Sequence, residues 1–215
     1  MITYPKIQTL LDRDPQTHKV TSQIRLPEFN LIRTWLLTEK VDGTNIRVIW
    51  DGKKVEFRGR TDRAQLYAPL FTKLQNLFLL RDFEAAFDEP PVTFYGEGYG
   101  PGIQKGGGNY SPEVNFRLFD VRVGEWWLNW PEVEDVAAKF GIRTVPVLGK
   151  FTDFLPTCQR ELEDILSVSI VAENENSTLI KPEGIVARTE PLLLLRNGKR
   201  LMWKIKFKDF EKEEK

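Results

Sequence analysis

Apolar and polar residues alternate over several stretches of the chain, and this period of two is typical of strands with one buried face. Trp35–Leu37 forms one apolar run, and Ile46–Trp50 forms the next. The polar segment Thr38–Asn45 between them predicts a short loop that holds Lys40. Considered alone, Lys40 is equally well interpreted as a solvated turn lysine.

Three hairpins are predicted where a glycine turn signal separates two runs of this kind. They pair 46–50 with 54–58 around Asp51-Gly52, 116–123 with 126–128 around Gly124, and 192–196 with 200–207 around Asn197-Gly198. Strands that arrive mostly as hairpins, with a few helices between them, indicate an α+β fold of antiparallel sheets.

Other stretches show helical spacing or carry no clear period. The spacing of apolar residues predicts three helices, at 69–80, 131–140 and 158–166. Val92–Tyr95 is predicted as a strand that runs into a glycine-rich loop at 96–102, where backbone can approach a ligand closely. Residues 1–33 are predicted to be a loosely structured lead-in.

Length and composition restrict the class of protein. The 215 residues, 41% of them hydrophobic and 29% charged, are expected to form a single soluble domain spanning 1–215. The 31 basic and 31 acidic residues cancel, so a nucleic-acid partner would have to be bound by a local patch. The only cysteine, Cys158, is interpreted as a packing residue, and the only histidine, His18, is expected at the surface. These counts argue against disulfides, zinc and a serine triad, and with no apolar span they favour a cytoplasmic protein without membrane contact.

The last predicted strand offers a binding site for an anion. Its alternation places Trp203, Ile205 and Phe207 on one face and Lys204 and Lys206 on the other. Two lysines on an exposed edge strand are the alternative interpretation.

Lysine chemistry becomes possible if these cations lie near Lys40. A lysine must be neutral to act as a nucleophile, and nearby positive charge, from Lys204, Lys206 or a bound divalent cation, favours its neutral form. The carboxylates of Glu97, Asp120 and Glu183, expected at strand ends or turns, can hold a divalent cation or bind sugar hydroxyls.

Six short segments in order resemble the motifs of the covalent nucleotidyltransferase superfamily of polynucleotide ligases and mRNA capping enzymes. The segments are Lys40-Val41-Asp42-Gly43-Thr44-Asn45, Arg60-Thr61, Gly96-Glu97 with Gly100-Pro101-Gly102-Ile103-Gln104-Lys105, Phe119-Asp120, Glu183-Gly184-Ile185-Val186 and Lys204-Ile205-Lys206. The chain is most similar to the small phage-type RNA ligases that seal nicked or duplex RNA. DNA ligases and capping enzymes usually carry arginine where this chain has Asn45, and the segment 100–105 is also more particular to the RNA ligase branch.

The resemblance implies a nucleotidyltransferase domain of two antiparallel β-sheets with flanking helices and a nucleotide pocket between the sheets. It implies an ATP-dependent RNA ligase that uses Mg²⁺ or Mn²⁺. Lys40 would attack the α-phosphate of ATP to give lysyl-AMP, the AMP would pass to an RNA 5′-phosphate, and a 3′-OH would then displace it. By the same resemblance, Lys204 and Lys206 would bind phosphate, and Arg60 would contact phosphate or ribose. Glu97 would bind the ribose hydroxyls, Phe119 would stack on adenine, and Glu183 with Asp120 would bind the metal. Glu39 and Asn45 would line the pocket or the strand-joining site.

The C-terminus departs from the family pattern. Relatives commonly carry an OB-fold or a helical domain after the last lysine motif. Here no such domain is expected, and the charged tail 208–215 is expected to be frayed. A protein partner that replaces this domain therefore stays open.

Two further functions also stay open. One is a stand-alone adenylyl- or guanylyltransferase with another acceptor, because the resemblance alone favours ATP over GTP and RNA over DNA or hybrid strands. The other is a non-catalytic module that binds RNA ends by stacking bases on Trp126, Trp127 or Trp130, although core packing is the favoured interpretation of these tryptophans.

Overall fold

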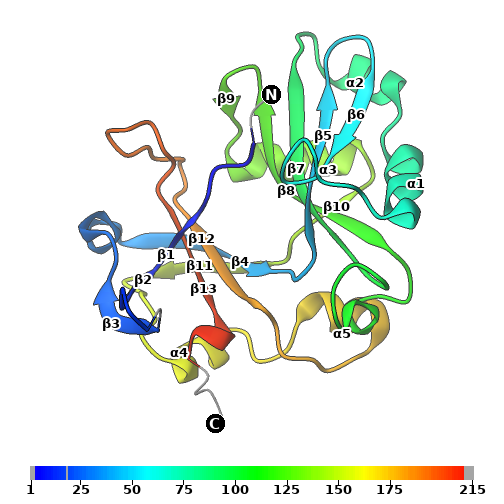
Figure 1. The fold of residues 1–215 in the computed structure, drawn as a ribbon. Coiled ribbons are helices and arrows are strands. Elements are labelled where there is room, and N and C mark those ends of the chain that lie inside the picture. The colour runs from blue at the N-terminus through cyan, green and yellow to red at the C-terminus, as the bar shows by residue number, and fades with distance from the viewer. Residues whose placement is uncertain (1–2, 18, 211–215) are drawn as a thin grey trace. The chain divides into compact units, whose positions relative to one another are not determined.

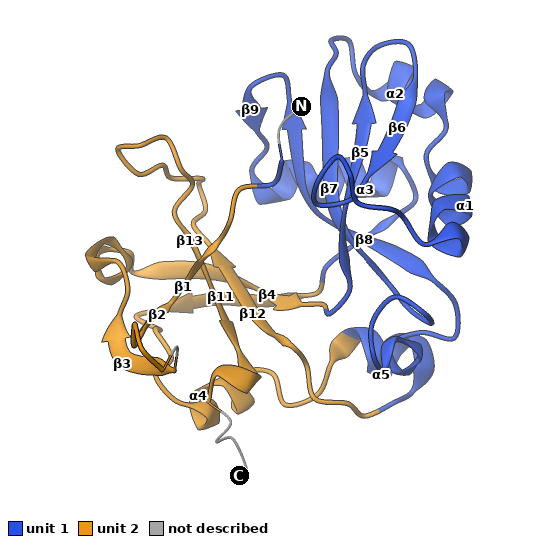
Figure 2. Cartoon of the chain, in the orientation of Figure 1, with its two compact units in different colours: residues 1–4, 42–145, 171–178 blue, residues 5–41, 146–170, 179–215 orange. Residues whose placement is uncertain are grey.

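The computed structural model describes residues 3–17 and 19–210, so His18 and residues 211–215 of the predicted tail lie outside the described residues. The chain forms two compact units that interleave along the sequence (Figure 2). Unit 1 comprises Met1–Tyr4, Asp42–Val145 and Val171–Thr178, and unit 2 comprises Pro5–Val41, Pro146–Ile170 and Leu179–Lys215.

Both units combine sheets with short helices, which confirms the predicted α+β class. In the described part of the chain, no helix has the length and apolar character needed to span a membrane.

Unit 1 is built on a six-stranded sheet with the order β10-β8-β7-β5-β6 and β9 beside β8 (Figure 1). Its strands are β5 (Thr44–Trp50), β6 (Val55–Arg58), β7 (Val92–Tyr99), β8 (Asn115–Val123), β9 (Trp126–Trp127) and β10 (Arg143–Thr144). The predicted hairpins β5–β6 and β8–β9 are both confirmed. The pairing of β10 with β8 is parallel, so this sheet is not wholly antiparallel.

A core rich in phenylalanine joins one face of this sheet to three helices. The helices of this unit are α1 (Ala68–Leu77), α2 (Leu80–Ala86), α3 (Trp130–Lys139), most of α5 (Ile170–Asn176) and the 3₁₀ helix η2 (Gly107–Asn109). Phe94 of β7 contacts Phe78 at the end of α1, Phe83 within α2 and Phe140 at the end of α3, with ring centroids 5.9, 5.0 and 4.9 Å away. The predicted helix at 131–140 is confirmed, and the helix predicted at 69–80 ends earlier, at Leu77. Helices α2 and α5 were not predicted.

The predicted glycine-rich loop at 96–102 is wrong over its first half, because β7 continues to Tyr99. A Cβ at Gly96 would overlap the Phe116 ring, and a Cβ at Gly98 would lie 2.5 Å from Leu70 Cδ2. These two glycines therefore serve close packing against a neighbouring strand and helix α1.

Unit 2 is built on a five-stranded sheet with the order β1-β13-β12-β4-β11. Its elements are β1 (Gln8–Thr9), β4 (Thr34–Lys40), β11 (Val147–Thr152), β12 (Gly184–Arg188) and β13 (Met202–Lys206), the separate pair β2 (Leu11–Arg13) and β3 (Val20–Ile24), helix α4 (Gln159–Glu163) and the 3₁₀ helices η1 (Pro27–Leu31) and η3 (Phe207–Asp209). Trp35 and Trp203 pack edge to face in its core, with ring centroids 5.7 Å apart. As predicted, Trp203, Ile205 and Phe207 are all buried.

Four predictions for this unit are wrong in detail. The described part of the lead-in 1–33 is structured, since it contains β1, β2 and β3 and buries Leu10 and Phe29 completely. Residues 192–196 are not a strand, and β13 pairs with β12. The predicted turn is nevertheless present, because Leu194 and Arg200 form an antiparallel bridge and the N–H groups of Leu195 and Leu201 donate to the carbonyl oxygens of Lys199 and Leu193 at 2.7 and 2.8 Å. The helix predicted at 158–166 is confined to Gln159–Glu163, and Cys158 before it is exposed instead of packed.

The described start of the predicted frayed tail is structured. Lys208 and Asp209 belong to η3, and Asp209 accepts a hydrogen bond from Arg13 Nη2 at 2.6 Å. The Asp209 side chain is only 4% exposed. This ion pair therefore fixes the start of the tail to strand β2.

Candidate active site

Lys40 is the last residue of β4, so the predicted polar loop around it is wrong at its start. Gly184 of β12 lies directly opposite Lys40 on one side and Lys206 of β13 on the other. Two residues further along β12, Val186 lies opposite Lys204. Because directly opposite residues share a face of the sheet, all three lysines lie on one face of unit 2.

Gly184, which lies between the two lysines, packs closely against the backbone of strand β13. A Cβ at this position would overlap the carbonyl oxygen of Ile205 in the neighbouring strand. A glycine is therefore required for β12 to run this close to β13.

The carboxylate of Glu183, the residue before β12, joins Lys40 to Lys206. Lys40 Nζ donates a hydrogen bond to Glu183 Oε2 at 2.5 Å, and Lys206 forms an ion pair with Oε1. The side chains are mostly buried, with 20% of Lys40, 24% of Lys206 and 13% of Glu183 exposed. Burial raises the pKa of Glu183, but the charges and hydrogen bonds of Lys40 and Lys206 outweigh burial and hold that pKa below its usual range. Glu183 is therefore ionised at neutral pH, and one negative charge faces two ammonium groups.

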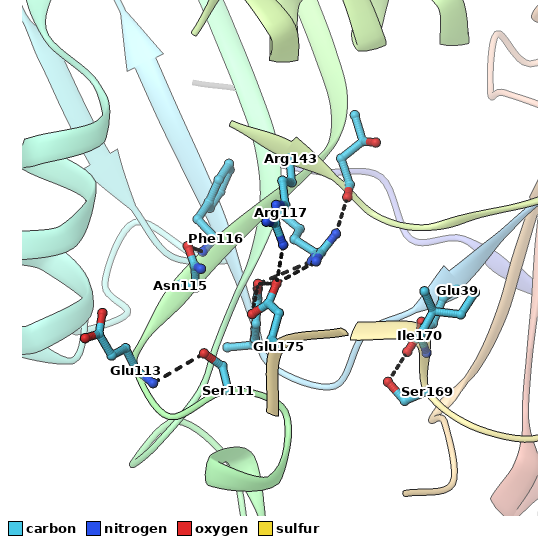
Figure 3. A network of polar contacts seen from close by, with 12 residues as sticks. Glu39, Ser111, Glu113, Asn115, Phe116, Arg117, Arg143, Ser169, Ile170 and Glu175 are labelled. Atoms are coloured by element: carbon cyan, nitrogen blue, oxygen red, sulfur yellow. Dashed lines mark hydrogen bonds and ion pairs between the residues drawn. The ribbon is translucent and has the colours of Figure 1, made fainter. Parts of the chain in front are cut away.

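Glu39 faces the opposite side of β4 from Lys40, because successive residues of a strand alternate. Its side chain accepts hydrogen bonds from Ser169 Oγ at 2.5 Å and from the backbone N–H of Ile170 at 3.0 Å (Figure 3). Glu39 is 1% exposed. These contacts fix the end of β4 from the buried side, and the expected contact of Glu39 with a nucleotide stays a prediction.

The matched segment 40–45 passes from one unit to the other. Lys40 belongs to unit 2, whereas Asn45 lies in β5 of unit 1. In unit 1, Gln104 Nε2 donates a hydrogen bond to the carbonyl oxygen of Gly43 at 2.9 Å. The structure therefore brings together two of the matched segments, 40–45 and 100–105.

The face of the unit 1 sheet that lies opposite the phenylalanine core is polar. Asn45, Glu97 and Arg117 are opposite one another on β5, β7 and β8 and share this face. Asn45 Oδ1 is a buried atom without a hydrogen-bond partner among the described residues. Glu97 and Asp120 lie within strands, so their expected places at strand ends or turns are wrong.

A β-bulge places Phe119 beside this face. Tyr95 is opposite Asp120 but the next residue of β7, Gly96, is opposite Leu118, so Phe119 is the extra residue of the bulge. Asp120 is completely buried and accepts a hydrogen bond from the Tyr4 hydroxyl at 2.6 Å.

Tyr4 is the residue that sequence reasoning missed. Its ring packs edge-on against the Phe119 ring, with centroids 5.0 Å apart, and it also contacts Tyr95 and Trp127. It lies in the predicted lead-in, where no periodic pattern marked it. Tyr4 thus contacts both a predicted adenine-stacking residue and a predicted metal ligand.

The remaining predicted residues occupy different surroundings. Arg60 is exposed in the loop after β6. Of the three tryptophans, Trp130 is buried and Trp127 is partly buried against Tyr95, but Trp126 is 80% exposed, so core packing is wrong for Trp126.

A second polar network ties α5 to the sheet of unit 1 (Figure 3). Arg117 Nη2 and the Tyr99 hydroxyl donate hydrogen bonds to Glu175 at 2.5 and 2.7 Å, and Arg117 Nη1 donates to the carbonyl oxygen of Thr144 at 2.9 Å. Burial raises the pKa of Tyr99, so its hydroxyl stays protonated. Tyr99 and Glu175 also line a cavity of about 430 Å³ that includes none of the predicted site residues.

The described residues contain no group of three or more His, Cys, Asp or Glu side chains arranged to hold a metal ion. Glu183 is the carboxylate of unit 2 that lies on the lysine face. Mg²⁺ is commonly bound by one or two carboxylates together with substrate phosphates. Glu183, a carboxylate beside Lys40 and Lys206, fits that mode of binding.

Comparisons with known proteins agree with these features. A family model described as RNA ligase matches residues 33–206. The fold also matches structures of Naegleria gruberi RNA ligase: one with PPi (17% identity, TM-score 0.63, 94% of this chain and 61% of that chain), a variant with ATP and Mn (20%, 0.64, 96% and 64%) and an apo variant (19%, 0.66, 98% and 63%). The chain thus spans about three fifths of the length of those proteins. No curated protein matches the sequence.

Proposed function

The chain belongs to the RNA ligase family, and on that premise we propose that it is an ATP-dependent RNA ligase that forms a covalent lysyl-AMP intermediate. The observation that carries this proposal is the cluster of Lys40, Glu183 and Lys206 on adjacent strands. A nucleophilic lysine, cations for a phosphate and a carboxylate for a divalent metal are the groups that adenylylation by ATP requires.

In the first step, Lys40 Nζ would attack the α-phosphate of ATP. An N–P bond would form, and the bond from the α-phosphorus to the bridging oxygen would break and release pyrophosphate. Lys206 and Lys204, on the same face as Lys40, would neutralise the charge of the α-phosphate in the transition state.

Lys40 must leave its ion pair with Glu183 before it can attack. An ammonium group bound to a carboxylate has no lone pair to donate. Glu183 would hold Mg²⁺ or Mn²⁺ in place of Lys40, and the metal would supply positive charge that neutralises the phosphates. Lys40 would then give its proton to solvent water, and the neighbouring cations would favour the neutral amine.

The nucleoside would be bound by the polar face of unit 1. Glu97 would accept hydrogen bonds from the ribose hydroxyls, Phe119 would stack on adenine, and Arg60 would contact a phosphate or the ribose. The unpaired Oδ1 of Asn45 supports a ligand contact there, because a buried acceptor without a partner is rare in a stable protein.

In the later steps, AMP would pass from Lys40 to the 5′-phosphate of an RNA strand, and a 3′-OH would displace it. The acceptor is therefore proposed to be a pair of RNA ends in a nicked or duplex RNA. A protein partner that grips the duplex is compatible with the net charge of +0, which gives the chain no general attraction for RNA.

The first step can be tested with ATP labelled at the α-phosphate, Mg²⁺ and the purified protein. A label should remain on the protein in a denaturing gel and disappear in Lys40→Ala. Lys150→Ala is a matched control, because Lys150 also lies in the unit 2 sheet and pairs with a glutamate, Glu190, at 3.0 Å. Labelling of Lys40→Ala at the level of the unchanged protein would refute the proposal.

A further inference from the structure

Arg47 is a completely buried arginine in the middle of β5. Its side chain lies on the polar face of the unit 1 sheet, two residues from Asn45, which shares that face. It is not part of any of the six matched segments that carry chemistry.

Both hydrogen bonds of Arg47 reach the segment that contains Arg60. Nε donates to the carbonyl oxygen of Gly59 at 2.9 Å, and Nη2 donates to Asp62 Oδ1 at 2.7 Å. Gly59 directly precedes Arg60, and Asp62 follows it by two residues. A single guanidinium group therefore bonds the chain on both sides of Arg60, through the backbone of Gly59 and the side chain of Asp62.

The segment 59–64 folds back on itself around Arg60. A Cβ at Gly59 would lie 2.7 Å from the Ala64 Cβ, and the N–H of Ala64 donates to the carbonyl oxygen of Thr61 at 3.2 Å. The hydrogen bond from Arg47 lowers the pKa of Asp62, which keeps the carboxylate charged and paired at neutral pH. Such a loop has few alternative conformations while both anchors are in place.

Burial makes Arg47 a costly residue for packing alone. Its Nη1 atom has no hydrogen-bond partner among the described residues. A buried cation with an unpaired nitrogen destabilises a fold, and a buried ion pair is often replaced as a whole by apolar side chains of similar volume without loss of stability.

We infer that Arg47 is a positioning residue that fixes the place of Arg60. This inference rests on the proposed function, in which Arg60 contacts a phosphate or the ribose of ATP. A fixed guanidinium at that position would lower the entropy lost when ATP is bound and aligned. Arg47 itself needs no contact with the nucleotide.

The informative variant is Arg47→Met, which keeps the buried volume and removes both hydrogen bonds. Asp62 is 60% exposed, so its carboxylate can be solvated after the change. We expect a modest fall in melting temperature, because the carbonyl oxygen of buried Gly59 loses its donor, together with mobile residues 59–62 and a loss of AMP transfer of about 10-fold or more. Arg33→Met is the matched control, because Arg33 also bonds an aspartate, Asp153, at 3.2 Å but is 80% exposed and lies in unit 2.

Two measurements separate positioning from general structure. Backbone nitrogen relaxation should show order parameters of residues 59–62 that fall from about 0.85 to below about 0.6 in Arg47→Met. In a double-mutant cycle, Arg47→Met should add no further loss of AMP transfer in an Arg60→Ala background, because the effect acts through Arg60.

Additive losses in the cycle, or an ordered loop in Arg47→Met, would overturn the inference. If the unchanged protein forms no AMP adduct, the proposed function fails. The relaxation data still decide in that case whether Arg47 holds residues 59–62.

Discussion

Replacing Glu183 with glutamine keeps the size of the side chain and removes the charge that pairs with Lys40 and Lys206. Removal of one partner from a fully buried ion pair costs about 3–5 kcal/mol, whereas an exposed pair contributes about 0–1 kcal/mol. The lysines here are 20% and 24% exposed and Glu183 is 13% exposed, which is close to the buried limit but allows partial solvation. We therefore expect Glu183→Gln to lower the free energy of unfolding by about 2–3 kcal/mol at pH 7.

Urea unfolding, followed by tryptophan fluorescence, measures this loss as a shift of the midpoint at constant slope. The matched control is Glu190→Gln, because Glu190 pairs with Lys150 at 3.0 Å and that lysine is 59% exposed. The control should lose at most about 1 kcal/mol.

The pH dependence gives a second test of the same charge. Because the folded-state pKa of Glu183 is lowered, its charge stabilises the protein above the unfolded-state pKa of about 4.3. This stability is lost as the pH falls through the lower folded-state value. The difference between the unchanged protein and Glu183→Gln should therefore be full above about pH 5 and shrink below it. An equal midpoint at pH 7, or a difference that persists unchanged at low pH, would refute the assignment of this charge pair.

Three further predictions address other parts of the site. Lys206→Ala should slow single-turnover AMP transfer by about 10²–10³-fold, as expected for loss of one cation that stabilises the transition state, whereas Lys150→Ala should not. Gly184→Ala should destabilise unit 2 by at least about 1–3 kcal/mol in urea unfolding, because the added Cβ would overlap the Ile205 carbonyl oxygen; an unchanged midpoint would contradict this packing. Tyr4→Phe should lower the free energy of unfolding by about 1–3 kcal/mol, because the completely buried Asp120 loses a hydrogen-bond donor. The control is Tyr67→Phe, which changes an exposed tyrosine. An equal loss in the two variants would show that the hydrogen bond contributes nothing to stability.

Local patterns predicted the parts of the site that lie on one strand. Alternation over 203–207 placed Lys204 and Lys206 opposite the buried Trp203, and the turn signal Asp51-Gly52 gave the β5–β6 hairpin. Both results depend only on residues a few positions apart.

The contacts between strands were not predictable in this way. Lys40 and Glu183 are 143 residues apart, and Tyr4 and Asp120 are 116 residues apart. Each contact exists because of a pairing or packing that no local period encodes. The segment 1–33 was misjudged because its strands are only two to five residues long, too short for alternation to be recognised.

Glycine residues in a sequence do not distinguish a loop from a closely packed strand. Freedom at positive φ and space for a close neighbour both require glycine, so Gly96 and Gly98 were interpreted as a loop although they allow strand β7 to pack against Phe116 and Leu70. Gly100 and Gly102, with φ of 114° and 78°, do form the expected turn beyond the strand.

The central claim is that Lys40 becomes covalently bound to AMP. Intact mass spectrometry after incubation with ATP and Mg²⁺, followed by peptide mapping, tests it most directly. We expect a mass increase of one AMP on the peptide that contains Lys40, abolished in Lys40→Ala and retained in Lys150→Ala. An adduct on a different residue, or no adduct under conditions in which the protein binds ATP, would contradict it.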